Sequence, residues 1–244
     1  MGFADIHIHS VHSHDGTCSI SAILKHVADK TNLDVIAITD HDKIGGIKEA
    51  MALGPKYGID VIPGCEVSTA QGHLLALYID GPIPAGRSLV ETVKRVAAMG
   101  GLCVVPHPEA PGISGLRETV IRAALADLQV AQTLVGIETF NGGLFLPHTN
   151  AIAARLGQAL GLARVGSSDS HVLSTIGDGT TEFEGRTAAD LRTALVAHTT
   201  IPHACPDASG VGVLRRWFPL FCLRKMGWVA ANAEPTSPIR YIRY

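Results

Sequence analysis

The first expected strand ends in the stretch Asp5-Ile6-His7-Ile8-His9, in which two histidines alternate with isoleucines. Side chains two positions apart lie on the same face of a β-strand, so His7 and His9 point together from one strand end. In a parallel α/β fold the carboxyl ends of the strands face the same way and build the active site. This short stretch therefore indicates both the fold class and the place where its chemistry occurs.

Other apolar runs repeat the strand pattern, and helical patterns lie between most of them. The expected strands cover residues 3–8, 34–39, 59–63, 73–79, 102–106, 134–138 and 163–167. The expected helices cover residues 19–31, 44–57, 87–100, 115–127, 148–160 and 187–198. Most of the strands are continuously apolar, which is typical of strands buried in parallel sheets. The pattern predicts a parallel α/β architecture closed into a barrel, with an open doubly wound sheet as the alternative.

The composition indicates a folded protein in a reducing compartment. The chain has 244 residues, of which 46% are hydrophobic and 17% are charged, so it can bury a large core. No apolar run reaches the roughly 18 residues of a membrane span, and no secretory leader follows Met1. The five cysteines are scattered and never form a CxxC pair. We therefore expect a cytoplasmic protein with no integral membrane segment.

The character of the chain changes near its C-terminal end. Residues 211–244 hold six Arg or Lys and one acid, a net charge of +5, whereas the preceding residues carry −7. We predict one domain at residues 1–203, followed by a linker and a basic, aromatic tail at 204–244. Pro219 is expected to interrupt any helix there. The tail is expected to pack over the barrel, with a membrane-surface, partner-binding or nucleic-acid-binding segment as the alternatives.

Ligand-type side chains collect where the expected strands end. Seven of the twelve histidines precede residue 74. The residues at strand ends or in the loops that follow are His7, His9, Asp15, Asp40, His41, Asp42, Glu66, His107, Glu138, Asp169 and His171, whereas His73 opens its strand. Imidazoles and carboxylates with few thiols suit Zn²⁺, Mn²⁺ or Fe²⁺. The sequence therefore predicts a metal site at one edge of the sheet.

A series of motifs resembles the polymerase and histidinol phosphatase (PHP) family. They are Asp5-Ile-His-Ile-His9, Ser13-His-Asp-Gly-Thr17, Thr39-Asp-His-Asp42, Pro63-Gly-Cys-Glu66, Pro106-His-Pro108 and Gly166-Ser-Ser-Asp-Ser-His171. Residues 136–141 and 150–154 also resemble stand-alone members with a PHP-associated segment. The resemblance covers roughly residues 3–200. It implies a distorted seven-stranded (β/α) barrel that holds two or three divalent metal ions.

The resemblance also implies a grouping of the ligands. The first ion would be bound by His7, His9, Glu66 and Asp169. The second would share Glu66 as a bridge, with His73 and His107. The third would be bound by Asp15, His41 and His171. A hydroxide that bridges two such ions would attack the phosphorus atom, and Glu66 would hold the bridged pair. The acid that protonates the leaving group is expected among Asp40, Asp42 and His171.

These features predict an enzyme, a metal-dependent phosphoesterase. Its expected substrate is a phosphomonoester of a small metabolite or nucleotide. The alternatives are a 5′–3′ exonuclease or phosphodiesterase acting on short oligonucleotides, a non-catalytic PHP module, and a metal-dependent amide or ester hydrolase. Every implied ligand position holds a ligand-type residue, which opposes loss of catalysis, and no lysine closes a strand, which opposes the amide hydrolase.

Two departures from the family leave the substrate open. Relatives that act on nucleoside phosphates carry a helical insertion between the fourth and fifth strands, where this chain has only about 20 residues. Those relatives also often place an arginine shortly after the His-Pro pair, whereas the first arginine after His107 here is Arg117. The reaction class is therefore implied more strongly than the substrate.

Overall fold

The computed structural model describes residues 1–244 except 112–114, 145–146, 206–209 and 233–235. The strands are β1 (Gly2–Ile8), β2 (Val35–Ile38), β3 (Asp60–Ser68), β4 (His73–Leu77), β5 (Leu102–Val105), β6 (Leu134–Asn141), β7 (Ala163–Ser167), β8 (Gly179–Phe183), β9 (Ile201–Ala204), β10 (Trp228–Ala231) and β11 (Arg240–Arg243). The α-helices are α1 (Ile20–Lys30), α2 (Ile47–Leu53), α3 (Leu89–Ala98), α4 (Glu118–Leu125), α5 (Leu128–Thr133), α6 (Pro147–Leu160), α7 (Ala188–Ala197) and α8 (Gly210–Lys225).

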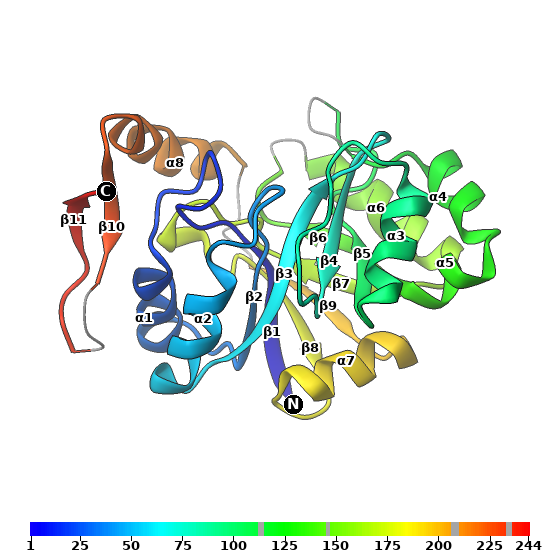
Figure 1. The fold of residues 1–244 in the computed structure, drawn as a ribbon, viewed down its shortest axis with the longest axis horizontal. Coiled ribbons are helices and arrows are strands. Elements are labelled where there is room, and N and C mark those ends of the chain that lie inside the picture. The colour runs from blue at the N-terminus through cyan, green and yellow to red at the C-terminus, as the bar shows by residue number, and fades with distance from the viewer. Residues whose placement is uncertain (112–114, 145–146, 206–209, 233–235) are drawn as a thin grey trace.

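One curved sheet forms the body of the molecule, with helices around it (Figure 1). In the described part of the chain this sheet has nine strands, in the order β7-β6-β5-β4-β3-β2-β1-β8-β9. The expectation of an α/β barrel is confirmed, and all seven expected strands are present. The strand number was too low because β8 and β9 were not predicted. The first alternates buried and half-buried residues and the second is exposed, so neither gives a continuous apolar run.

The sheet is mixed rather than parallel. Strand β4 runs antiparallel to both β3 and β5, whereas β1, β2 and β3 are parallel to one another. Only residues 69–72 join β3 to β4, and a link this short makes a hairpin but cannot cross over to a parallel strand. The reversal brings the first residue of β4, His73, to the edge where β3 and β5 end. This explains why His73 opens its strand while the other ligand-type residues close theirs.

The two ends of the sheet approach each other and nearly close the barrel. The hydroxyl group of Thr181 in β8 donates to the carbonyl oxygen of Gly166 in β7 (2.8 Å), and the N–H group of Gly166 donates back to Thr181 Oγ1 (3.1 Å). The hydroxyl group of Thr200 likewise donates to the carbonyl oxygen of Arg164 at 2.8 Å. A Cβ atom at position 166 would lie 2.5 Å from the carbonyl oxygen of Thr180, so this closure requires glycine.

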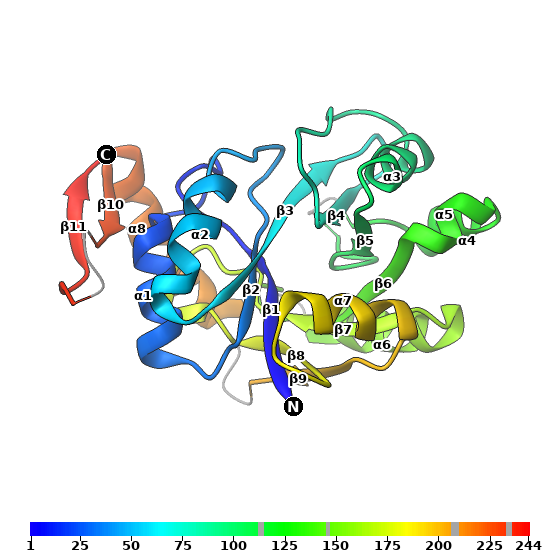
Figure 2. The same cartoon turned by 60° about the horizontal axis from the view of Figure 1, so that its bottom comes forward.

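Alternate residues of the strands face two different apolar clusters. In β2, Val35 and Ala37 belong to the cluster that α7 joins, whereas Ile36 and Ile38 belong to the cluster that packs against α1. Helix α7 lies near the N-terminal end of β1, as Figure 2 shows. Its Leu191 and Leu195 side chains are completely buried. The helix therefore plugs the end of the barrel opposite the strand ends that carry the candidate ligands.

The C-terminal segment packs against the loop that follows β1. Hairpin β10–β11 lies beside α1 (Figures 1 and 2), and the N–H group of Ser19 donates to the carbonyl oxygen of Ala230 at 2.8 Å. Helix α8 continues through Pro219, so the expected interruption was wrong. Tertiary hydrogen bonds made by residues on both sides of Pro219 hold the two halves in place, and tertiary contacts can override the cost of a proline. The division of the chain at residue 203 stays a prediction.

Within the described ranges, none of the helices combines the length and the apolar character that a bilayer span requires.

Candidate metal centre

The side chains expected to bind metal lie together at one edge of the barrel. Four groups place their nitrogen and oxygen atoms within 4.8 Å of one another: His9 with Asp15, His41 and His171; His7 with His9 and Glu66; His7 with His107 and Asp169; and His41 with Glu66 and His73. The groups share members, so they form one continuous cluster. All nine residues named from the sequence belong to it.

Glu66 lies at the centre of the cluster, and its two oxygens face different histidines. Oε2 lies 3.1 Å from His41 Nδ1, 3.2 Å from His7 Nε2 and 3.4 Å from His9 Nε2. Oε1 lies 2.9 Å from His73 Nδ1 and 3.0 Å from His107 Nε2. Burial alone would raise the pKa of Glu66, but the charge of His7 and the hydrogen bond from His107 hold it well below its usual range. The Glu66 side chain is therefore an ionised carboxylate, and both of its oxygens are directed at histidines.

Asp169 completes one side of this arrangement. Its Oδ1 atom lies 3.3 Å from His7 Nε2 and 3.2 Å from His9 Nε2. Together with Glu66, these three side chains make a group of four that converge at this point. The pKa of Asp169 is held well below its usual range because the surrounding histidines outweigh its burial. Its backbone is left-handed (φ 51°), as is that of His107 (φ 28°), a conformation that costs energy in residues other than glycine. Such strain is common at functional sites.

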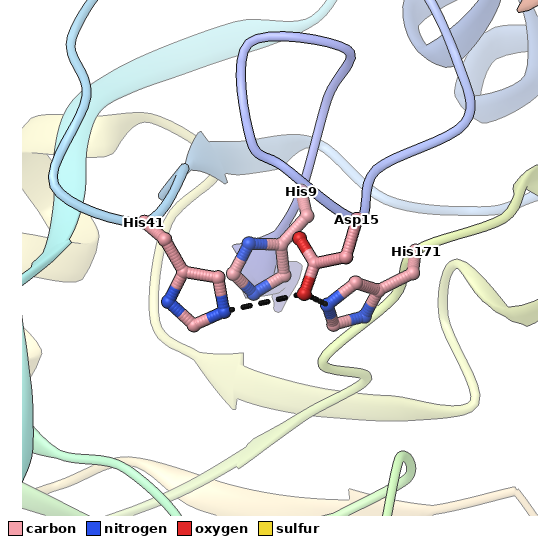
Figure 3. A group of neighbouring side chains, drawn as sticks. All are labelled: His9, Asp15, His41 and His171. Atoms are coloured by element: carbon pink, nitrogen blue, oxygen red, sulfur yellow. Dashed lines mark hydrogen bonds and ion pairs between the residues drawn. The ribbon is translucent and has the colours of Figure 1, made fainter. Parts of the chain in front are cut away.

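A second side of the cluster gathers around Asp15. Figure 3 shows the side chains of His9, Asp15, His41 and His171 directed toward one another. Oδ2 of Asp15 lies 3.1 Å from His171 Nε2 and 3.5 Å from His41 Nε2. Burial alone would lower the pKa of His171, but the hydrogen bond with Asp15 raises it to about 9. The rings of His9 and His171 stack with centroids 4.1 Å apart, which connects the two sides.

The donor set fits divalent cations. Among the described residues, His7 Nε2, His9 Nε2, Glu66 Oε2 and His73 Nδ1 are buried without a well-formed hydrogen bond. A buried polar atom without a partner costs about 1–3 kcal/mol, and cations held on the two sides of Glu66 would satisfy these atoms. Every converging atom is a nitrogen or an oxygen. The residues could therefore hold metal ions of the class that imidazole and carboxylate ligands prefer.

A second buried carboxylate fixes the orientation of His7. Glu138 Oε1 accepts a hydrogen bond from His7 Nδ1 at 2.8 Å, so the opposite ring nitrogen is directed toward Glu66. Glu138 Oε2 accepts from the backbone N–H group of His107 and from Asn141 Nδ2, both at 2.8 Å. The sequence placed Glu138 among the ligand-type residues at the strand ends. The structure places it behind His7, where it supports two ligand-type residues.

Two of the three candidate acids face away from the cluster. The carboxylate of Asp40 accepts from the N–H group of Ser10 at 2.6 Å and from its hydroxyl group at 2.7 Å. The carboxylate of Asp42 accepts two hydrogen bonds of 2.7 Å from Ser68. His41 enters the cluster, whereas its two neighbours are held by these serines, and the left-handed backbone of Asp42 (φ 50°) turns the chain away after His41.

The third candidate acid, His171, lies within the cluster. Its Nδ1 atom lies 2.9 Å from the carbonyl oxygen of Asp169, which fixes this nitrogen as the donor. Its Nε2 atom faces Asp15. With Nδ1 as the donor, loss of the proton on Nε2 would leave a lone pair directed at the cluster, so the geometry is compatible with His171 as a metal ligand.

Sequence reasoning missed several residues that shape the site. The hydroxyl group of Ser13 donates to Asp15 Oδ1 at 2.8 Å, and Asn141 Nδ2 lies 3.2 Å from Asp169 Oδ2. Ser13 lies within a quoted motif, so its position near Asp15 was a usable signal. Trp217 donates from Nε1 to the carbonyl oxygen of Asp15 at 3.1 Å. No spacing pattern connects residues 202 positions apart, so this contact had no signal in the sequence.

Comparisons with known proteins agree with this geometry. The family described as PHP domain matches residues 5–107, and the family described as PHP-associated matches residues 147–200. An uncharacterised protein of Methanocaldococcus jannaschii, MJ1587, is 35% identical over 148 residues, which are 57% of this chain and 81% of that protein.

Two relatives that are named for an activity match shorter stretches. A 5′-3′ exoribonuclease of Haemophilus influenzae is 32% identical over 52% of this chain and 47% of its own length. A 3′,5′-nucleoside bisphosphate phosphatase of Chromobacterium violaceum is 30% identical over 50% of this chain and 44% of its own length.

A solved structure extends the likeness to nearly the whole chain. It is a two-domain protein of Bacteroides vulgatus that contains a predicted PHP-like metal-dependent phosphoesterase. The TM-score is 0.68 at 20% identity, and the match covers 95% of this chain and 71% of that one. This likeness concerns the fold alone, whereas the family matches concern the sequence. The chain belongs to the PHP family and carries a PHP-associated segment.

Proposed function

We propose that this chain hydrolyses a phosphomonoester of a small molecule with the help of two or three divalent metal ions. The chain is a hydrolase of the PHP family, in which relatives named as phosphatase and exoribonuclease both act on phosphoesters. One observation carries the proposal. Buried Glu66 presents its two oxygens to different sets of histidines, Oε2 to His7, His9 and His41 and Oε1 to His73 and His107, and such a carboxylate can give one oxygen to each of two neighbouring cations.

The contacts support the grouping of ligands that the family resemblance implies. His7, His9 and Asp169 would hold one ion with Glu66 Oε2, and His73 and His107 would hold a second with Oε1. Asp15, His41 and His171 would hold a third. Divalent ions bound there would lower the pKa of water and offset the charge of phosphate oxygens. Mn²⁺, Zn²⁺ and Fe²⁺ all suit these donors.

The chain's own residues orient and charge this site. Glu66, Asp169 and Asp15 are anions, because neighbouring histidines hold the pKa of each below its usual range despite burial. Glu138 holds His7 in the tautomer whose Nε2 faces the site. Asp40 and Asp42 are assigned to loop structure, since Ser10 and Ser68 occupy their oxygens.

A substrate with two different bonds separates phosphomonoesterase from nuclease activity. The Mn²⁺-loaded protein is incubated with a 5′-phosphorylated pentanucleotide, and the products are resolved over time. Free phosphate with unchanged chain length supports the proposal. Stepwise release of mononucleotides supports the exonuclease instead. If neither this substrate nor a set of small phosphomonoesters reacts while metal is bound, the proposal is wrong and a non-catalytic module is favoured.

A further inference from the structure

A slot of about 330 Å³ adjoins the cluster on the side of Asp15. Its polar end is lined by Asp15, Asp169 and His171, which are residues assigned above to metal binding. Its apolar walls include Leu144 on one side and three side chains of helix α8, Val213, Leu214 and Trp217, on the other. The polar end of the slot would therefore attract a phosphate group through bound metal ions. Its apolar walls offer no favourable contact to a charged group.

Helix α8 is fixed firmly relative to the candidate ligands. Nε1 of Trp217 donates to the carbonyl oxygen of Asp15 at 3.1 Å, and Nη2 of Arg224 donates to the carbonyl oxygen of Val11 at 2.8 Å. Nη1 of Arg216 donates to the carbonyl oxygen of Ser174 at 3.0 Å, just beyond His171. These bonds join the helix to the two loops that carry Asp15 and His171. The apolar wall thus keeps a set distance from the place where a phosphate would bind.

The lining of the slot selects for an uncharged group. None of the described lining residues is a lysine or an arginine, so a second phosphate would lose its hydration there without gaining a cation. The basic side chains of Arg216 and Arg224 bind backbone oxygens instead. The volume is at the small end of the range for ligand pockets, which suits one ring or nucleoside rather than a strand of nucleotides.

We propose that this slot binds the uncharged, ring-sized apolar or aromatic group of a phosphomonoester, with Trp217 and Leu214 as its specificity-determining residues. This inference rests on the function proposed above and adds the class of substrate. The C-terminal segment then has a defined role, since α8 supplies the wall that recognises the organic part of the substrate.

Hydrolysis of two substrates tests the preference. The Mn²⁺-loaded protein is assayed with phenyl phosphate and with glycerol phosphate, and kcat/KM is measured for both. We expect phenyl phosphate to be preferred, and Trp217→Ala and Leu214→Ser each to lower the ratio of the two values about tenfold or more, as loss of an apolar contact does. Phe218→Ala is the matched control, because Phe218 is 56% exposed on the same helix and does not line the slot. An unchanged ratio in the two slot variants overturns the inference.

A binding measurement separates this inference from the proposed function. Trp228→Phe leaves Trp217 as the single tryptophan, since the chain has two. We expect benzylphosphonate to change the emission of Trp217 in the Mn²⁺-loaded variant and methylphosphonate to leave it unchanged. If the emission changes but no phosphoester is hydrolysed, the slot is supported and the activity is wrong. If phosphoesters are hydrolysed while both phosphonates leave the emission unchanged, the activity is supported and the slot is wrong.

Discussion

Nδ1 of His7 lies 2.8 Å from Oε1 of Glu138, and both side chains are completely buried. The other ring nitrogen of His7 lies 3.2 Å from Glu66. The imidazole of His7 therefore lies between two carboxylates, with Glu138 behind it and Glu66 in front of it. Glu138 acts as a positioning residue, because its hydrogen bonds are with His7, with the backbone N–H group of His107 and with the side chains of Asn141 and Ser167.

Replacing Glu138 by Gln is expected to weaken metal binding without unfolding the chain. The amide keeps the size of the side chain but removes its charge, and such changes behind a ligand typically cost about 10–100-fold in metal affinity. Metal content after dialysis against graded Mn²⁺ buffers, together with the far-UV spectrum, measures this effect. Glu184→Gln is the control, since Glu184 is exposed in a loop after β8. Equal metal affinity in the two variants would contradict the role of Glu138.

Replacing Glu66 by Gln is expected to lower kcat by at least about 10²-fold, the scale on which loss of one electrostatic group in an active site is felt. The amide cannot offer an anionic oxygen to both sets of histidines. Bound metal is expected to fall in the same variant, which metal analysis of the purified protein detects. Full turnover with full metal content would rule out Glu66 as the bridge.

Removal of metal is expected to lower thermal stability markedly. Ions present at about 1,000 times their dissociation constant stabilise a folded chain by about 4 kcal/mol, which for a chain of this size corresponds to roughly 8–16 °C in Tm. The measurement compares melting in excess Mn²⁺ with melting after a chelator is added. The same comparison with Glu66→Gln should give a smaller shift. A chelator that leaves Tm unchanged would show that the cluster binds no ion tightly.

A glycine next to Asp15 provides a test of the loop that carries it. A Cβ atom at position 16 would lie 1.9 Å from the carbonyl oxygen of Ser10, so Gly16→Ala forces the loop to move. We expect a loss of about 1–3 kcal/mol in unfolding free energy, the usual cost of overpacking, and a loss of activity because Asp15 shifts with the loop. Gly81→Ala is the matched control, because the nearest atom to its Cβ lies 3.7 Å away. Chemical denaturation of both variants measures the difference, and equal stability would contradict the tight fit.

The strands that repeat an apolar pattern could be predicted from the sequence. The strands that close the barrel, β8 and β9, could not. The strands from β1 to β7 are apolar runs with ligand-type residues at one end, so both the barrel and the cluster could be located. His73 was the exception in the sequence, and the reversal of β4 explains it. Strand β9 has no apolar signal, because its residues are largely exposed and its place is set by pairing with β8.

Side-chain direction was the other limit. Asp40, His41 and Asp42 are all ligand types, and only the backbone path shows that the middle one enters the cluster. The tail illustrates the same point at longer range. Trp217 reaches the site through its bond with Asp15, and the contact exists because α8 folds back over the loop after β1. A sequence read locally indicates which residues can do chemistry, but the topology decides which of them meet.

The position of Asp169 has a consequence for how the protein acquires its ions during synthesis. Its carboxylate lies 3.2–3.3 Å from His7 and His9, although these residues are about 160 positions away along the chain. A nascent chain that has left the ribosome only as far as His107, just after β5, already contains seven of the nine ligand-type residues, but it lacks this carboxylate and His171. The proposed set of ligands is therefore complete only once His171, just beyond β7, has been translated, and the strands that close the barrel, β8 and β9, still follow it.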